Sequence, residues 1–199
     1  MTWIRTLSFE EADERLRKIY GQVQMPDGHI DNILKVHSLR PQTLTGHLAL
    51  YKSAMHSKPN ALTPRERELV GVCVSLSNEC DYCVEHHRAG LARHVGDEGL
   101  AGRLTEASQL QGDISVLTPR EQELCRYALK LTRSPAAMRE SDLAPLRSAG
   151  LDHAGILDLN QIVSYFAYAN RTVLGLGITT DGEPLGLHPD EDREGYEHA

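Results

Sequence analysis

The chain has 199 residues, of which 40% are hydrophobic and 25% are charged, and its formal net charge is −7. These values are ordinary for one globular domain, so they exclude collagen-like, disordered and disulfide-dense small proteins. The acidic balance and the lack of a basic stripe argue against nucleic acid as a partner. No apolar run has the length of a membrane span or a signal peptide, so we expect a cytoplasmic protein without a membrane partner.

Helical periodicity recurs along the chain, whereas strand patterns are rare. A capping box at Ser8–Glu11 predicts a first helix that runs to Val23 and ends at Met25–Gly28. Further helices of various lengths are expected at residues 33–39, 44–55, 62–76, 80–94, 100–110, 121–131, 143–148 and 152–175. The sequence therefore predicts an all-α fold, a compact bundle of several helices.

Two of these helices begin with the same five residues, because Leu62–Glu66 and Leu117–Glu121 both read L-T-P-R-E. Each segment places threonine at the N-cap, proline at the first helical position and glutamate at the third, which is a strong helix start. The repeat is typical of an internal duplication. Capping chemistry alone favours the same residues, so both interpretations stay open.

No flexible linker divides the chain, so residues 1–180 are expected to form a single all-α domain. Residues 181–199 hold seven acidic residues and one arginine, a composition that predicts a solvated acidic tail. The stretch beyond Gly177 is rich in glycine and proline, which is typical of a loop or of an arm docked on the domain.

Reactive side chains are concentrated in residues 79–87, which read E-C-D-Y-C-V-E-H-H. Residues three and four apart are neighbours on a helix, so Cys80 should lie beside Cys83, and Cys83 one turn from His87. A helix N-terminus or a nearby base increases the thiolate population, and a second cysteine can capture a sulfenic acid. This spacing suits a two-cysteine peroxide or disulfide chemistry.

Two other interpretations of the cysteine pair stay open. Cys80 and Cys83 could supply zinc ligands together with His86 or His87, although a structural zinc site usually needs a fourth protein ligand. The pair could also be two inert buried cysteines. The remaining cysteines fit apolar helical positions and are expected in the core: Cys73 and Cys125.

Glu68, Cys80, Cys83 and His87 follow the spacing glutamate, eleven residues, then C-x-x-C-x-x-x-H. In this spacing the chain resembles the alkylhydroperoxidase D-like branch of the carboxymuconolactone decarboxylase superfamily, including its uncharacterised peroxidase-related members. The core of the resemblance spans about residues 40–95. It implies an all-α fold assembled as homo-oligomers (trimers or hexamers) and a peroxidase activity. Such an enzyme is expected to need no cofactor and no metal, because the cysteine pair itself holds the two electrons. It also implies a peroxide substrate and an external dithiol reductant of protein or lipoyl type.

The resemblance implies a role for each of the four residues. Cys83 resembles the peroxidatic cysteine, which attacks the peroxide, and Cys80 resembles the resolving cysteine. His87 and Glu68 resemble members of the proton relay that activates the thiol. We therefore expect the pair to cycle between dithiol and disulfide.

The chain departs from the family pattern at the residue before the second cysteine. The family's histidine is replaced there by Tyr82, and a phenol is a poor proton carrier at neutral pH. Tyr82 and the neighbouring His86 are candidate auxiliary groups. Two other functions would use the same residues: a protein disulfide oxidoreductase or redox adaptor, and a non-enzymatic helical assembly module with a metal-bound or inert cluster.

Overall fold

A computed structural model describes residues 2–25 and 27–186, and in these ranges the chain is all-α, which confirms the predicted fold class. The elements are α1 (Glu14–Val23), α2 (Asn32–Lys35), α3 (Pro41–Tyr51), the π-helical turn η1 (Lys52–His56), α4 (Pro64–Ser77), α5 (Asp81–Val95), α6 (Glu98–Ala107), α7 (Pro119–Arg133), the 3-10 turns η2 (Pro135–Ala137) and η3 (Glu140–Leu143), α8 (Ala144–Ser148) and α9 (His153–Leu176). No helix in the described ranges is long and apolar enough to cross a membrane.

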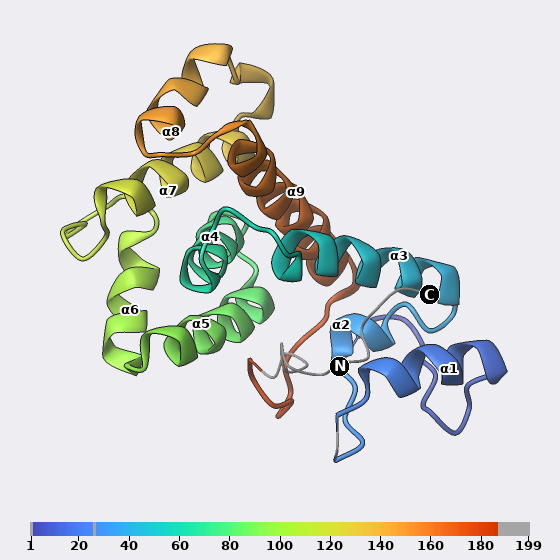
Figure 1. Cartoon of the computed structure of the whole chain (residues 1–199). Coiled ribbons are helices and arrows are strands. Elements are labelled where there is room, and N and C mark those ends of the chain that lie inside the picture. The colour runs from blue at the N-terminus through green and yellow to red at the C-terminus, as the bar shows by residue number, and fades with distance from the viewer. Residues whose placement is uncertain (1, 26, 187–199) are drawn as a thin grey trace.

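Helix α4 is the central element of the larger part of the molecule, with α5, α6, α7 and α9 around it (Figure 1). Its buried Leu69 and Val70 join one core with Leu124 of α7 and Phe166 of α9. Gly71 allows a close approach of α4 to α9, because a Cβ atom there would lie 2.3 Å from the Phe166 ring. The helix that carries Glu68 is therefore fixed on several sides.

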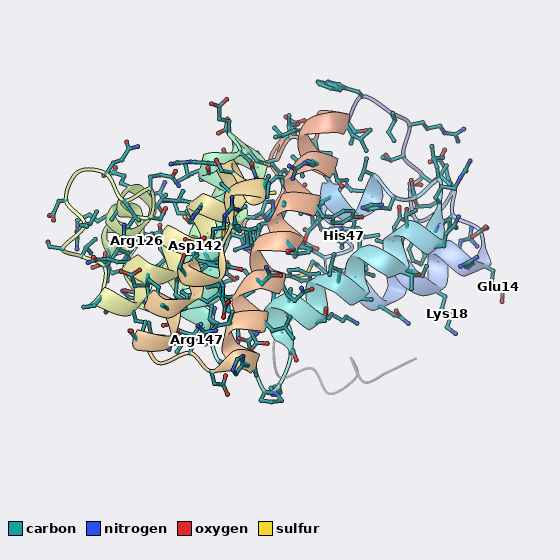
Figure 2. All side chains as sticks on the ribbon, turned by 90° about the horizontal axis from the view of Figure 1, so that it is seen from above. Glu14, Lys18, His47, Arg126, Asp142 and Arg147 are labelled. Atoms are coloured by element: carbon teal, nitrogen blue, oxygen red, sulfur yellow. The ribbon has the colours of Figure 1, made fainter. Side chains whose placement is uncertain are left out.

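Helices α1, α2 and α3 form a smaller group beside this bundle, with a second apolar cluster that includes Leu16, Tyr20 and Leu44. Figure 2 shows this group at one end of the molecule, marked by Glu14 and Lys18 on α1. Arg126, Asp142 and Arg147 mark the opposite end, which contains α7 and α8.

The first helix begins later than its capping box predicts. The backbone N–H of Ser8 donates to Glu11 Oε2 at 2.9 Å, and that of Glu11 donates to Ser8 Oγ at 3.3 Å, so the box is present. The box closes a turn only. The helix starts at Glu14, where the Asp13 side chain accepts from the backbone N–H of Leu16. The predicted start was wrong because a second cap follows the first, and the helix uses the second one.

The two L-T-P-R-E segments start α4 and α7 as predicted, each with a complete capping box at Thr63 or Thr118. The two helix starts are also joined by two reciprocal ion pairs, in which the arginine of each segment binds the glutamate of the other. Arg65 Nε lies 2.8 Å from Glu121 Oε1, and Arg120 Nε lies 2.7 Å from Glu66 Oε1. A duplication remains a prediction, but the two copies occupy equivalent places in the fold.

Beyond the left-handed cap Gly177, the chain returns along the bundle as an arm, residues 178–186, which lies near α2 and α5 (Figure 1). Thr179 accepts from the Asn32 side chain at 3.0 Å, and the backbone of Gly186 lies so close to α5 that a Cβ atom there would meet Ala89 at 2.9 Å. Glu183 is 7% exposed, so the expectation of a solvated tail was wrong for this residue. Residues 187–199 of the predicted tail lie outside the described residues, and the division at residue 180 stays a prediction.

Candidate functional site

The cysteine pair lies at the start of α5. Glu79 has a φ of 56°, in the left-handed region that non-glycine residues rarely adopt. This residue turns the chain between α4 and α5. Cys80 is the N-cap residue of α5 and Cys83 lies in its first turn. Both thiols are free and buried, with residue exposures of 0% and 3%.

The two thiols share a hydrogen bond that separates their acidities. The bond from the Cys83 thiol lowers the pKa of Cys80 below its ordinary value, and the Asn170 side chain adds to this effect. The same contact with Cys80, together with burial, raises the pKa of Cys83 well above its ordinary value. In this geometry the first proton to leave the pair leaves a thiolate on Cys80, which accepts from Cys83.

Asn170 is a site residue that the sequence did not assign to the chemistry. Its side chain is fully buried. It donates to Ser75 Oγ at 3.1 Å and accepts from Asn78 at 2.9 Å. These bonds fix an amide beside both cysteines, and its hydrogen bonds lower the pKa of each.

Glu68 and His87 form a buried pair between α4 and α5. Glu68 Oε2 lies 2.7 Å from His87 Nδ1, and both side chains are less than a tenth exposed. The Phe166 ring packs edge-on against the imidazole, with ring centroids 4.6 Å apart. The carboxylate therefore fixes the ring through Nδ1, which leaves Nε2 as the nitrogen available for proton transfer.

Tyr82 and His86 lie against the C-terminal arm. The Tyr82 hydroxyl donates to Glu183 Oε1 and accepts from the backbone N–H of Ile33 at 3.3 Å. Burial and the Glu183 carboxylate raise the pKa of Tyr82 far above its ordinary value, so the phenol stays neutral. His86 Nε2 lies 3.1 Å from Glu183 Oε1. The two candidate auxiliary residues thus share one carboxylate, Glu183, which the sequence did not indicate.

A cavity of about 590 Å³ reaches the cysteine site. Cys83 and His87 line it, whereas Cys80 does not. Its other walls include Arg67 from α4 and aromatic side chains of α3 and α9, among them Tyr51 and Tyr165. The space is large enough for a small organic molecule, and Cys83 is the thiol that such a molecule would meet.

Residues 41–113 match the model of the carboxymuconolactone decarboxylase family. No curated protein matches the chain. Among solved structures, an uncharacterized peroxidase-related protein from Silicibacter sp. TM1040 is 26% identical, with a TM-score of 0.78 over 89% of this chain and 91% of that one. An alkylhydroperoxidase AhpD core protein from Ralstonia eutropha JMP134, also peroxidase-related and uncharacterized, is 24% identical, with a TM-score of 0.79 and the same coverage.

The debrominase Bmp8 shares the fold at lower identity: 15%, with a TM-score of 0.71 over 87% of this chain and 89% of that one. A cysteine-to-alanine variant of that debrominase has been solved with 2,3,4-tribromopyrrole. The helical fold, the family match over residues 41–113 and the peroxidase-related neighbours together support a place for this chain in the alkylhydroperoxidase D-like branch of the carboxymuconolactone decarboxylase superfamily. Members of the superfamily are enzymes of varied types.

Proposed function

We propose that this protein is a thiol-dependent peroxidase that reduces hydrogen peroxide or small organic hydroperoxides. One observation carries the proposal: Cys83 and His87 line the same cavity, and Glu68 Oε2 lies 2.7 Å from His87 Nδ1 and orients the imidazole. A nucleophile, a base and a group that orients the base are the components of an activated thiol. The similarity of the chain to a peroxidase-related protein supports the same reaction.

Cys83 is the residue we assign to the attack on peroxide. The lower pKa belongs to Cys80, but Cys80 is fully buried and does not line the cavity, so a peroxide in the cavity reaches only Cys83. Moving the Cys83 proton to Cys80 or to His87 makes Cys83 the thiolate. Since the two thiols already share a hydrogen bond, this transfer needs no rearrangement of the helix.

The reaction then has two steps in which atoms and electrons balance. The Cys83 thiolate attacks one peroxide oxygen, the O–O bond breaks, and the alcohol or water leaves with a proton from His87; Cys83 is now a sulfenic acid. The Cys80 sulfur attacks the Cys83 sulfur, the S–O bond breaks, and water leaves. The product is a Cys80–Cys83 disulfide, which an external dithiol reduces.

The burial of both sulfur atoms limits which external reductant can reach the disulfide. Direct thiol exchange with a folded protein needs contact between sulfur atoms, and Cys80 and Cys83 are 0% and 3% exposed. A slender dithiol, such as a lipoyl group, enters the 590 Å³ cavity more readily. The geometry therefore favours a peroxidase with a lipoyl-type reductant over a protein disulfide oxidoreductase.

The proposal extends to assembly and compartment. We propose a homo-oligomer, a trimer or hexamer, in the cytoplasm, where the disulfide can be reduced after each turnover. Exposed apolar side chains on α9, namely Leu157, Tyr168 and Leu174, offer apolar area for such contacts. Light scattering of the purified chain measures its mass in solution, and a monomer at micromolar concentration would contradict this part.

The test of the chemistry is the mass of fully reduced, metal-free protein after one equivalent of cumene hydroperoxide. We expect the loss of two hydrogens, mapped by peptide analysis to a Cys80–Cys83 disulfide. The Cys80→Ser variant should stop at a sulfenic acid on Cys83, which dimedone traps. Cys125→Ala is the matched control, since Cys125 is buried on α7, away from the cavity lining, and it should still form the disulfide.

Two outcomes would contradict the proposal in different ways. Unchanged mass with both thiols still alkylatable would remove peroxide as a substrate. Dimedone labelling of Cys80 in the Cys83→Ser variant, with Cys80→Ser unreactive, would exchange the roles of the two cysteines. Turnover with dihydrolipoamide and with thioredoxin then measures which kind of reductant resets the pair.

A further inference from the structure

Metal-binding side chains meet at a second place, beyond the cysteine pair. His29 Nε2, Asp31 Oδ1 and a carboxylate oxygen of Glu183 all lie within 4.8 Å of one another. His29 and Asp31 belong to the turn before α2, and Glu183 belongs to the C-terminal arm. In the described ranges this is the one group of three or more histidine, cysteine or acidic side chains close enough to share a metal ion, and it contains no cysteine.

Buried polar atoms at this group lack hydrogen-bond partners. Within the described part of the chain, His29 Nε2, Asp31 Oδ1 and His86 Nε2 are all inaccessible and form no hydrogen bond. The His86 side chain is 9% exposed, and its Nε2 lies 3.1 Å from Glu183 Oε1 without the alignment of a hydrogen bond. A buried polar atom carries a free-energy cost when nothing satisfies it. A ligand shared by these atoms would remove that cost.

The spacing of the atoms fits a metal ion. With metal–nitrogen and metal–oxygen bonds of about 2.0–2.1 Å, neighbouring ligand atoms are about 3.3–3.4 Å apart in a tetrahedral site and about 2.9 Å apart in an octahedral one. His29 Nε2 and Asp31 Oδ1 are 3.4 Å apart. This separation matches two ligands of one small cation.

The local charge also favours a cation. The group brings the carboxylates of Asp31 and Glu183 together beside His29. Glu183 is held in this place by the backbone N–H of Asn32, which donates to its Oε2 at 3.1 Å. Two carboxylates kept together in a buried site are compensated well by one divalent ion.

We propose that His29, Asp31 and Glu183 form a binding site for a divalent transition-metal ion of the zinc type. One imidazole and two carboxylates are donors that such ions accept in proteins. Asp31 and His86 also line the cavity, so the ion would lie at the cavity wall and would tie the arm to the start of α2. The proposal is independent of the peroxidase reaction.

The test measures binding of Zn²⁺, and of Co²⁺ as a spectroscopic probe, to the full chain stripped with a chelator. The Cys80→Ser/Cys83→Ser background removes the competing thiolates. We expect one equivalent of either ion per chain, a Co²⁺ spectrum without thiolate bands, and a rise in the unfolding temperature with Zn²⁺. His29→Gln and Glu183→Gln should each weaken binding by at least about tenfold. His153→Gln, at an exposed position on α9, is the matched control and should bind as the background does.

Absence of binding in the thiol-free background would overturn the proposal, as would unchanged affinity in His29→Gln. Because the His29 side chain is 20% exposed on a turn, its variant keeps the helices, and far-UV circular dichroism checks this. Peroxide oxidation of the cysteines is measured separately on metal-free protein, so failure of one proposal does not decide the other.

Discussion

Gly90 of α5 lies directly against the carboxylate of Glu68 on α4. A Cβ atom at residue 90 would stand 2.9 Å from both Cδ and Oε2 of Glu68, closer than side-chain carbons approach in folded proteins. The carboxylate is fixed on its other side, where Oε2 binds His87 Nδ1 at 2.7 Å. The absence of a side chain at Gly90 therefore makes room for the buried pair that orients His87.

We expect Gly90→Ala to reduce peroxidase activity while the fold persists. The added methyl group pushes the Glu68 carboxylate away from His87, and a displacement near 1 Å in a catalytic assembly costs up to about 100-fold in rate. Alanine is itself a better helix former than glycine, so α5 should not unwind. The measurement is kcat/KM for cumene hydroperoxide, together with the thermal unfolding midpoint.

Gly102→Ala is the control for this prediction. Gly102 also lies within a helix, α6, but a Cβ atom there meets only Arg88 at 3.8 Å, an ordinary contact. This variant should keep the parent activity. Equal activity in the two variants would show that the position of Glu68 does not govern the rate.

Local chemistry explains which helix boundaries could be predicted. The starts of α4 and α7 follow from capping boxes at Thr63 and Thr118, in which every hydrogen bond joins residues three apart. The same reasoning placed the first helix at Ser8. There the box forms, but Asp13 supplies the cap that α1 uses, and the sequence offers no local reason to prefer one over the other.

Contacts between distant residues explain what could not be predicted. Cys80, Cys83 and His87 were predicted to lie together because they have helical spacing, whereas Glu68 was assigned only through the resemblance to the family motif. Glu183 meets Tyr82 across 101 positions of sequence, and its acidic neighbours in the sequence indicate a solvated tail instead. The H-x-D spacing of His29 and Asp31 is the only local signal for the second group, and its third member comes from that same arm.

The reciprocal ion pairs between the two helix starts lead to a prediction about stability. Glu121 is 2% exposed and binds Arg65 at 2.8 Å, whereas the Arg65 side chain is 33% exposed. Arg65→Ala leaves a buried carboxylate without its cation. We expect a loss of about 2–3 kcal/mol in unfolding free energy, less than for a fully buried pair because water reaches the arginine. Urea unfolding measures it.

Arg126→Ala on the same helix α7 is the matched comparison. Its partner Glu123 lies 3.2 Å away on the surface, and the Arg126 side chain is 58% exposed. An exposed pair of this kind contributes about 0–0.5 kcal/mol. A similar loss in both variants would mean that burial of Glu121 does not decide the contribution of Arg65.

His47 should make the protein sensitive to acid. It lies on α3 beside α9 (Figure 2), 2% exposed, with its ring 5.8 Å from that of Tyr165. Burial, helped by the nearby His37, lowers the pKa of His47 to about 3. The unfolded chain, with a histidine pKa near 6.5, binds a proton between pH 6.5 and 3 that the folded chain does not. Stability therefore falls as the pH falls through this window.

His47→Gln removes the group whose protonation in the unfolded chain lowers the stability at acidic pH. Between pH 7 and pH 5 the parent should lose about 2 kcal/mol more unfolding free energy than the variant, following the linkage of a single group. Urea unfolding at both pH values gives the difference. His153→Gln, at an exposed position, is the control and should show the same dependence of unfolding free energy on pH as the parent. If His47→Gln also showed the parent's dependence, His47 would have to accept a proton in the folded state.

Tyr82 replaces the histidine that precedes the second cysteine in well-characterised alkylhydroperoxidases, and its hydrogen bonds point to a different role. The hydroxyl binds Glu183 and the backbone of Ile33, so it joins α5 to the arm and to α2. Because the pKa of Tyr82 is raised far above its ordinary value, the phenol neither gains nor loses a proton near neutral pH.

We therefore expect Tyr82→Phe to act on the arm more than on the chemistry. Loss of the hydroxyl leaves the buried Glu183 with one donor fewer, which should cost about 1–3 kcal/mol in unfolding free energy and increase amide exchange in residues 178–186. The pH profile of peroxide oxidation should keep its shape, because no titrating group is lost.

Glu68→Gln provides the contrast: it removes the charge that orients His87 and should lower kcat/KM by about 100-fold or more. A pH profile altered by Tyr82→Phe, with amide exchange of the arm unchanged, would make Tyr82 part of the proton path.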